Sequence, residues 1–229
     1  MLGVAALLVA SAAAFRGGGW LLLWPATGNF LLAAAFFSGR PALLGKDPQG
    51  RYALPARLIL LPYWLFLDLF HRLMDRRDHR FTAVEVAPGL LLGGYPGARP
   101  LATGVDLVVD VASELPRAVA TRELEYLYVP CLNRRAPEAA ALSRVLPRLA
   151  AHRGRILIHC GAGKGRSAAL AAAVLMARGE AESLDEAERL IRALRPGVAL
   201  HPPQRRLVEE LLTAFHAGHG SPSRCGPRR

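Results

Sequence analysis

The sequence predicts an α/β fold, with a central sheet flanked by helices and an apolar region before it. Short apolar runs recur between residues 84 and 160, as in buried strands. Segments with apolar residues at helical spacing lie among and after these runs, up to residue 216. Two longer apolar runs fill most of the first 40 residues, which indicates a separate hydrophobic hairpin.

The first 40 residues are expected to form a transmembrane hairpin. The apolar runs cover residues 1–15 and 20–37, and Arg16 with three glycines joins them. A helix needs about 20 apolar residues to cross a bilayer, so each run is near the lower limit. A signal peptide followed by an anchor is the main alternative, although no Lys or Arg precedes the first run. A buried hairpin in a soluble protein is a third interpretation.

Residues 41–80 are predicted to form a juxtamembrane linker with an interfacial helix. The run 56–77 is apolar but contains Pro62 and Asp68, and Tyr63 and Trp64 would lie at headgroup depth. The alternative is a helix that packs on the following domain. By the positive-inside rule, the basic residues after the second run place this side in the cytoplasm, at an inner or plasma membrane. These residues are Arg40, Lys46, Arg51, Arg57, Arg72, Arg76 and Arg77.

Residues 81–217 carry the pattern of the α/β domain. Strands are expected on both sides of the Pro88-Gly89 turn and over residues 105–111, 125–130 and 155–160, the last of them central in the sheet. Helices are expected over residues 137–151, 167–176 and 203–216, with Pro147 kinking or dividing the first. A further helix begins with a capping box of Ser183 and Glu186. Residues 218–229 are expected to be a disordered basic tail.

Composition favours an anionic partner, because the formal net charge is +11. Much of this charge lies beside the apolar runs or in the tail, where anionic lipid is the simplest partner. No nucleic-acid-binding module is recognisable, so no nucleic acid is expected. The three cysteines are too few and too scattered for a disulfide framework or a zinc site, which favours a reducing compartment and no metal.

The stretch IHCGAGKGRSAAL, residues 158–170, joins a strand end to a helix through a glycine-rich turn. Glycines let backbone N–H groups converge and a helix N-terminus adds partial positive charge, so an anion would bind between Cys160 and Arg166. An arginine fork holds two phosphate oxygens, and the same positive field lowers the pKa of the thiol. The loop therefore combines a nucleophile with an oxyanion binder. Its glycine spacing fits neither a Walker A loop nor a dinucleotide fingerprint.

The order His-Cys-five residues-Arg-Ser, at His159, Cys160, Arg166 and Ser167, resembles the signature of the cysteine-dependent protein tyrosine phosphatase superfamily. The resemblance implies that Cys160 forms a cysteinyl-phosphate, that Arg166 binds the phosphoryl oxygens and that Ser167 helps the thiolate leave. It also implies that His159 orients the loop through hydrogen bonds and that no cofactor is needed. The amides that would cradle phosphate belong to Gly161, Ala162, Gly163, Lys164, Gly165 and Arg166.

From about residue 85 to 215 the chain is similar to the small dual-specificity-like branch of that superfamily. The stretches LLLGGYP, VVDVASE and RPGVALHPPQ look like its opening strand, its second central strand and its run into the final helix. The apolar N-terminus is similar to bacterial membrane-anchored members. The resemblance implies a dual-specificity-phosphatase-like sheet and hydrolysis of phosphomonoesters, with a phosphorylated protein or a phospholipid as substrate.

One position departs from the family pattern. The family places its general acid in the order Val-Pro-x-x-Asp, whereas this chain reads VPCLN, with Asn133 in place of the aspartate. An amide cannot donate a proton to a leaving oxygen. The acid could come instead from Glu138, Asp110 or Glu114, although Asp110 is expected to brace a loop.

Two further interpretations of Asn133 stay open: a slow phosphatase that prefers activated or aryl phosphates, and a pseudophosphatase that binds phosphorylated ligands without turnover. We favour catalysis because the cysteine, arginine and serine of the loop are intact.

Three residue types near the loop bear on the substrate and on regulation. Lys164 adds a cation, and CxAGKGR is similar to the loop of phosphatases that act on phosphoinositides, although a solvated lysine is an alternative. Arg134 and Arg135 would either line a cationic rim or be solvated. Cys131 is a candidate for a protective disulfide with Cys160 under oxidation, or an inert buried cysteine.

Overall fold

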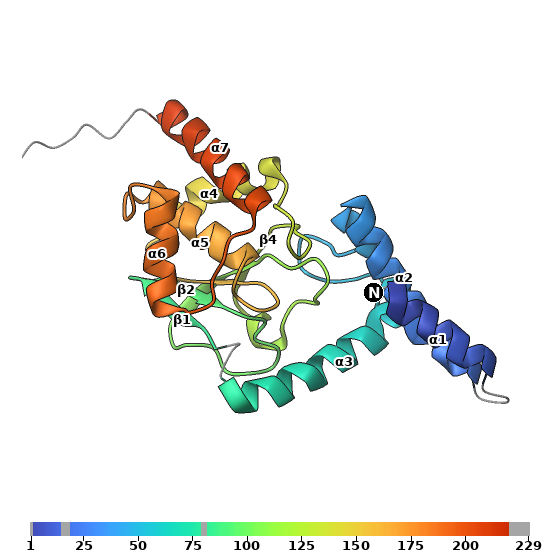
Figure 1. Ribbon diagram of the computed structural model, residues 1–229. Coiled ribbons are helices and arrows are strands. Elements are labelled where there is room, and N and C mark those ends of the chain that lie inside the picture. Colours follow the sequence, from blue (N-terminus) through green and yellow to red (C-terminus); the bar gives the residue numbers. More distant parts are fainter. Residues whose placement is uncertain (1, 15–18, 79–81, 220–229) are drawn as a thin grey trace, which may run out of the picture.

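The computed structural model describes residues 2–14, 19–78 and 82–219, so residues 220–229 of the expected tail lie outside it. A five-stranded sheet in the order β1-β2-β5-β3-β4 forms the centre of the domain (Figure 1). Its strands are β1 (Val84–Ala87), β2 (Leu90–Gly93), β3 (Val105–Asp110), β4 (Glu125–Tyr128) and β5 (Arg155–His159). This is the α/β architecture that the sequence predicts.

The strand β5 lies in the middle of the sheet, as its continuous apolar sequence predicts. Apart from the antiparallel pair β1 and β2, neighbouring strands run parallel. The carboxyl ends of β3 and β5 therefore meet at one edge, where Asp110 is in register with His159. Loops that follow these two strands are brought together at that edge.

Four helices cover one face of the sheet: α4 (Ala139–Ala151), α5 (Arg166–Ala177), α6 (Leu184–Leu194) and α7 (Pro202–His219) (Figure 1). Alternate strand residues such as Val109 and Ile158 join the core beneath these helices. The intervening residues, among them Val108 and Leu157, form a smaller cluster on the other face. Burial of both faces explains why the strands are apolar throughout.

Two helix details test the sequence patterns. At the start of α6, Ser183 Oγ accepts a hydrogen bond from Glu186 N at 3.2 Å, while the Glu186 carboxylate accepts one from Glu182 N at 2.8 Å. The capping box is therefore formed, except that the Glu186 carboxylate binds the backbone N–H of Glu182 and not that of Ser183. Of the two outcomes expected at Pro147, a kink or a division of the helix, the division is wrong, because α4 continues through it. Proline removes one backbone donor there, and the buried leucines of α4 hold the helix on the core.

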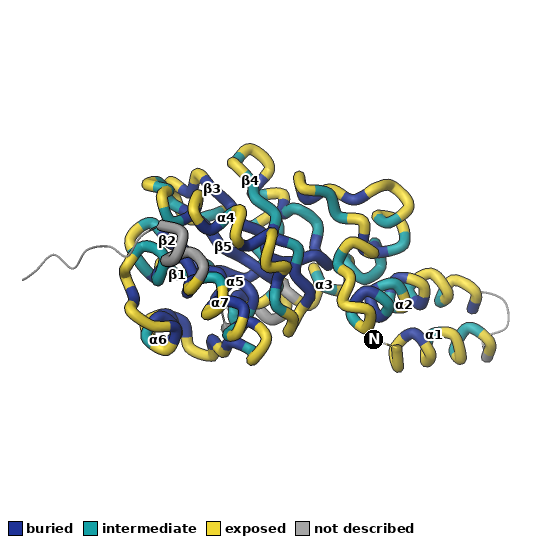
Figure 2. The backbone as a smooth tube through the Cα atoms, turned by 90° about the horizontal axis from the view of Figure 1, so that it is seen from above, coloured by how far each residue is buried: buried dark blue, intermediate teal, exposed yellow. Residues whose placement is uncertain are grey.

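The N-terminal helices lie side by side and project from the domain: α1 (Leu2–Ala14), the 3₁₀ helix η1 (Gly19–Leu22) and α2 (Leu23–Ser38) (Figure 1). About half of the residues in these helices are exposed, in larger proportion in α1 than in α2 (Figure 2). The combined segment Gly19–Ser38 is long and apolar enough to cross a membrane, whereas α1, with 13 residues, is shorter than a span. A signal sequence or a buried core helix has the same length and composition.

The helix α3 (Leu54–Asp78) is longer than predicted and continues through Pro62 and Asp68. It crosses α2 at close range, since a Cβ on Gly28 would stand 2.5 Å from the carbonyl oxygen of Ile59. Only glycine allows this approach. Residues 41–53 precede α3 and include the 3₁₀ helix η2 (Pro41–Leu44).

We call residues 41–78 the juxtamembrane segment, after the position that the sequence leads us to expect for it. It packs on the domain, because Leu44, Tyr52 and Leu60 form a buried cluster with Leu132 from the loop after β4. Lys46 is also buried, so it is not one of the charges available to a lipid surface. The opposite side of α3 is apolar and exposed, through Leu58, Leu65, Phe66, Leu69 and Leu73.

Candidate active site

The glycine-rich loop runs from the end of β5 to the start of α5 and wraps around the thiol of Cys160. The side chain is 3% exposed, and its Sγ accepts a hydrogen bond from Gly163 N at 3.3 Å and lies 3.2 Å from Ser167 Oγ. Gly163 has φ of 70°, and a Cβ there would stand 2.5 Å from the carbonyl carbon of Gly93. This position therefore requires glycine.

Arg195 supports the outer side of the loop, a role that its sequence position did not reveal. Its Nε donates to Gly163 O at 2.8 Å and its Nη2 to Ala162 O at 3.3 Å, while Nη1 binds Thr82 O at 2.7 Å. In a trans peptide the N–H points opposite to the C=O. Because Arg195 holds these carbonyls outward, the amides that follow them face the other side, where an anion would lie.

The other loop residues take less specific positions. Ala162 is exposed and Gly161 and Gly165 are half-buried. Lys164 is half-buried, and its Nζ lies beside the turn at Gly197. Ala199 N donates to the Lys164 carbonyl at 3.0 Å, which fixes the loop to the segment before α7.

The pKa of the Cys160 thiol lies below its ordinary value, although burial alone would raise it. The positive charge of Arg166 and the hydrogen bonds from Ser167 and Gly163 outweigh burial because they stabilise the thiolate. A lowered pKa favours the thiolate, which is the reactive form of a cysteine.

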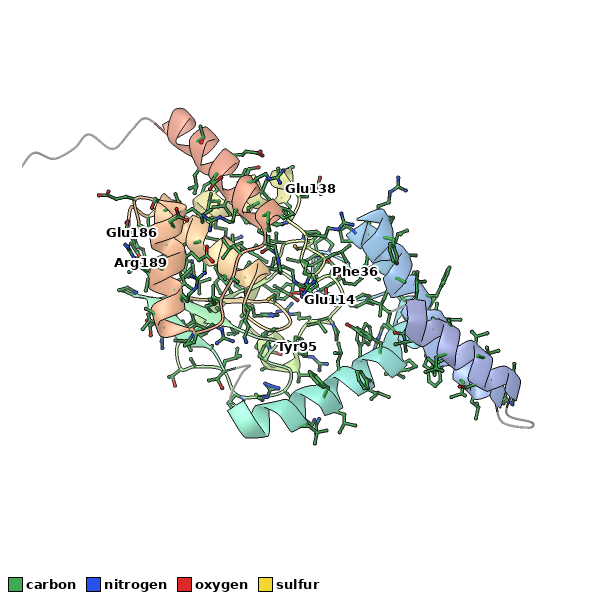
Figure 3. The ribbon with its side chains drawn as sticks, in the orientation of Figure 1. Phe36, Tyr95, Glu114, Glu138, Glu186 and Arg189 are labelled. Carbon is green, nitrogen blue, oxygen red and sulfur yellow. The ribbon has the colours of Figure 1, made fainter. Side chains whose placement is uncertain are left out.

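Arg166 is held by a bidentate ion pair with Glu114, from the loop after β3. The distances are 2.8 Å from Nη1 to Oε2 and 2.6 Å from Nη2 to Oε1, and Nη1 also donates to Cys131 O at 3.1 Å. Both side chains are almost fully buried. Figure 3 shows Glu114 in the region between the sheet and α2. Glu114 therefore orients the arginine, and this ion pair speaks against its use as a general acid.

Asp110 braces the same loop, as its sequence position led us to expect. Its carboxylate accepts hydrogen bonds from Lys46 Nζ and Tyr126 Oη, both at 2.7 Å, and from Ala112 N at 2.9 Å. Burial acts to raise the pKa of Asp110, but the opposing contributions, led by the Lys46 charge and including the hydrogen bonds from Lys46 and Tyr126, together outweigh it, and the pKa lies below its ordinary value. An ionised, fully buried carboxylate cannot supply a proton at neutral pH.

The expected hydrogen bonds of His159 are not found among the residues that the structure describes. Both ring nitrogens are buried without a partner, and Nδ1 stands 4.0 Å from Asp110 Oδ1. Burial lowers the pKa of His159, so the ring is neutral at neutral pH. The ring packs edge-on against the ring of Tyr95, with the two ring centroids 6.1 Å apart. The backbone N–H of Tyr95 donates a hydrogen bond to the Gly161 carbonyl. The hydrogen-bonding role expected of His159 therefore stays a prediction, and the contact described for its ring is packing against Tyr95.

The loop after β4 carries the position expected for the acid. Asn133 and Arg134 are exposed in a turn closed by Arg135 N and Leu132 O, and Arg134 has φ of 62°. Arg135 is not merely solvated, because its Nη2 donates to Phe36 O near the end of α2 at 3.0 Å. Glu138 is exposed at the start of α4. Of the three alternative acids, only Glu138 has a carboxylate without a hydrogen-bond or ion-pair partner among the described residues, and the residue is exposed.

Cys131 is buried, and its Sγ contacts the carbonyls of Leu132 and Arg135 at 3.4 and 3.3 Å. Burial raises the pKa of this thiol to about 12, so it is protonated at neutral pH. Both described cysteines are free. This environment is that of an inert cysteine.

Among the described residues, no group of three or more His, Cys, Asp or Glu side chains could hold a metal ion. A groove of about 650 Å³ lies between residues 39–43 and the loop after β4, next to the end of α2. Arg40, Arg135 and Glu138 line it together with prolines and other apolar residues.

Fold and loop together define a class, the cysteine-dependent phosphatases, in which a buried thiolate faces a phosphate-binding arginine. Residues 92–211, just over half of the chain, match the family model described as dual specificity phosphatase, catalytic domain. The chain belongs to this family.

Relatives and a solved structure agree with this assignment. Mouse (Mus musculus) dual specificity protein phosphatase 12 is 35% identical over 127 residues, which cover 50% of this chain and 36% of the relative. Human (Homo sapiens) dual specificity phosphatase 28 is 34% identical over 158 residues, covering 62% of this chain and 86% of the relative. A mutant form of Tk-PTP is similar with a TM-score of 0.51 and 28% identity, covering 59% of this chain and 97% of that chain.

The hydrogen bond between Ser167 and Cys160 leads to a testable prediction. Ser167→Ala removes a group that stabilises the thiolate, so the pKa of Cys160 moves up toward its ordinary value. Activity requires the thiolate and rises with pH through that pKa. The rising limb of kcat/KM against pH is therefore expected to move to higher pH, with the largest loss of rate in acid. Ser143→Ala, an exposed hydroxyl of α4, is the matched control; an unshifted profile for Ser167→Ala would contradict the assigned contact.

Proposed function

We propose that this chain is a membrane-anchored phosphatase that hydrolyses phosphomonoesters through a cysteinyl-phosphate intermediate. The observation that carries the proposal is the Cys160 thiol, whose pKa is lowered by Arg166 and by hydrogen bonds within the glycine-rich loop. One turn thus carries the nucleophile Cys160, the phosphoryl binder Arg166, and Ser167, which assists the departing thiolate.

In the first step the Cys160 thiolate attacks phosphorus, the P–O bond to the leaving group breaks, and its electron pair goes to the leaving oxygen. An arginine guanidinium carries five N–H donors. Glu114 and the Cys131 carbonyl take three of them, which leaves two for the phosphoryl oxygens. These two donors and the loop amides stabilise the charge that develops on the transferred group, and the mechanism requires no metal.

In the second step water attacks phosphorus, the P–S bond breaks, and the thiolate leaves with the electron pair. Ser167 Oγ, 3.2 Å from Sγ, donates a hydrogen bond to the sulfur as its charge returns. The attacking water loses its proton to solvent or to phosphate. The enzyme then returns to its starting state.

The proposed substrate has a good leaving group. Without an acid at Asn133, the first step is fast only when the leaving oxygen needs no proton, as with a phenolate. Phosphotyrosine and other aryl phosphates meet this condition, whereas alkyl phosphates depend on another acid such as Glu138. A phospholipid phosphomonoester is the second candidate, favoured by the groove beside the end of α2 with its Arg40 and Arg135.

Membrane anchoring is supported by the segment Gly19–Ser38 and by the exposed apolar side of α3. Segments of this kind insert into or lie on a bilayer, and an anionic lipid surface suits the formal charge of +11. The basic residues after α2 favour a cytoplasmic catalytic domain at an inner or plasma membrane. A phosphorylated protein or lipid of that membrane would then be the substrate.

The deciding experiment traps the intermediate. Wild type and Ser167→Ala, both as the full chain, are mixed with an aryl phosphate and quenched in acid, and the phosphorylated peptide is identified by mass spectrometry. We expect phosphate on Cys160, in greater amount in Ser167→Ala because the second step is slowed. Cys160→Ser is the control and should release no phosphate.

The alternative is a pseudophosphatase that binds phosphorylated ligands, and Asn133 is the observation that favours it. Binding of inorganic phosphate without a trapped intermediate and without turnover, in a folded full chain, would establish this alternative and reject the enzyme.

A further inference from the structure

The loop after β3 supports the phosphate-binding arginine and is itself held from outside the matched family domain. We call residues 111–115 the support loop; it includes Glu114, the ion-pair partner of Arg166. Three side chains of the juxtamembrane segment donate hydrogen bonds to its backbone carbonyls. We propose that Lys46, Tyr52 and Trp64 are positioning residues that hold the support loop, and through Glu114 the guanidinium of Arg166, in the phosphate-binding orientation.

Lys46 holds the beginning of the support loop. Its Nζ donates to the Ala112 carbonyl and to the Asp110 carboxylate, both at 2.7 Å, and its side chain is 0% exposed. The two contacts join the end of β3 to the first residues after it. Desolvated hydrogen bonds of a charged group are among the stronger ones in proteins.

Tyr52 and Trp64 hold the rest of the loop. Tyr52 Oη donates toward the Ser113 carbonyl and lies 3.2 Å from the Leu115 carbonyl, on either side of Glu114. Trp64 Nε1 donates to the carbonyl of Glu114 itself at 2.9 Å. The two rings also pack against each other, with centroids 4.9 Å apart. One segment therefore donates hydrogen bonds to the carbonyls of Ala112, Ser113 and Glu114, and its Tyr52 hydroxyl also lies beside the Leu115 carbonyl.

Glu114 transmits this positioning because its carboxylate contacts both terminal nitrogens of Arg166. A bidentate pair fixes the plane of the guanidinium, and a shift of the Glu114 backbone would rotate that plane. Catalytic groups lose much of their effect when displaced by about 1 Å. The juxtamembrane segment thus does more than connect the anchor to the domain.

The inference goes beyond the proposed function, and it rests on that proposal only in taking Arg166 as the phosphate binder. It adds direct contacts between the two parts of the chain that the sequence predicts, the juxtamembrane or interfacial helix and linker of residues 41–80 and the phosphatase domain of residues 81–217. Without residues 46–64, the support loop would expose four carbonyls and leave Asp110 without its lysine.

The test compares two tryptophans of the same N-terminal region. Trp64→Phe keeps an aromatic ring but removes the donor to Glu114, whereas Trp24→Phe removes an equivalent indole donor to Leu58 O, at 2.7 Å, away from the support loop. Each full-length variant is purified in detergent. Affinity for inorganic phosphate, kcat/KM for an aryl phosphate and the unfolding temperature are measured.

For Trp64→Phe we expect phosphate affinity and kcat/KM to fall together by about tenfold, the effect of one buried hydrogen bond. Trp24→Phe should stay within about twofold of wild type in both. A purely structural role for Trp64 would lower the unfolding temperature and leave phosphate affinity of the folded protein unchanged. That result, or an equal loss in Trp24→Phe, would overturn the inference.

Tyr52→Phe, which removes one hydroxyl, serves as a second variant should Trp64→Phe not fold, and the same criteria apply to it. Phosphate binding also separates this inference from the proposed function. Wild type that binds phosphate in a Trp64-dependent manner but shows no turnover would reject catalysis and keep the inference. Turnover together with a phosphate affinity that does not depend on Trp64 would keep the proposed catalysis and reject the inference. Wild type that binds no phosphate would reject both.

Discussion

Replacing Lys46 with methionine is expected to lower the free energy of unfolding by about 3–5 kcal/mol. Lys46 and Asp110 form a 2.7 Å ion pair with both side chains 0% exposed. The substitution keeps much of the volume of the lysine stem and removes its charge, so Asp110 is left buried without its cation. Removing one partner of a buried pair costs more than the pair contributes, because the remaining charge stays desolvated.

Chemical denaturation of the full chain in detergent measures this change. The double variant Lys46→Met with Asp110→Asn is the control and should recover much of the loss. The single oxygen of its neutral amide can still accept from Ala112 N, and its NH₂ group can donate to Tyr126 Oη, which accepts in place of donating. A loss below about 1 kcal/mol for Lys46→Met would show that the pair is not desolvated as described.

The ion pair of Lys46 and Asp110 also determines the direction in which the stability of the protein changes with pH. The folded-state pKa of Asp110 is lowered, so its contribution to stability is present above the ordinary pKa of an aspartate and is lost as pH falls through the folded value. The stability difference between wild type and Lys46→Met should therefore be largest near neutral pH and narrow in acid.

Introducing an acid, Asn133→Asp, is expected to raise kcat for an alkyl phosphate by about 10²- to 10⁴-fold, the usual contribution of general acid catalysis. The loop after β4 already contacts the site, since Cys131 O accepts a hydrogen bond from Arg166 two residues before Asn133. For an aryl phosphate with a low leaving-group pKa the gain should be small. Steady-state rates on both substrates measure the contrast.

The pH profile of the Asn133→Asp variant provides an internal check. The added carboxylic acid acts only when protonated, so the variant should acquire a falling limb at high pH that wild type lacks. Glu138→Gln in the wild-type background examines the remaining alternative acid. Equal alkyl phosphatase rates in wild type and Asn133→Asp, with a large loss in Glu138→Gln, would assign the acid to Glu138 instead.

Local sequence was sufficient for the elements that local interactions specify. The five strands and the helices of the domain follow from apolar runs, helical spacing and the cap at Ser183, with boundaries that differ by a few residues. The sequence left a division of the helix at Pro147 open, whereas α4 continues through it, because packing against a core compensates for a lost backbone hydrogen bond.

The glycine-rich loop was identifiable because its chemistry is contiguous. The thiol, the glycine at position 163, the arginine and the serine lie within eight residues of chain, and a strand-to-helix turn brings such residues together wherever it occurs. Glu114, by contrast, was considered as an acid because the chain alone does not reveal its partner. It lies 52 residues from Arg166, and only the register of β3 beside β5 brings the two together.

The chain therefore specifies its nucleophilic loop, its α/β pattern and its apolar N-terminus through neighbouring residues alone. Folding determines the support around that loop: Lys46 on Asp110, Trp64 on Glu114, Arg195 behind Gly163 and Arg135 on α2. These contacts join residues that are 32 to 99 positions apart in the chain. Each contact is made by one side chain, and the residues next to it in the sequence form no periodic pattern that marks it. Long-range pairs of this kind depend on how the sheet and the helices pack, so the local spacing of residues in the sequence does not predict them.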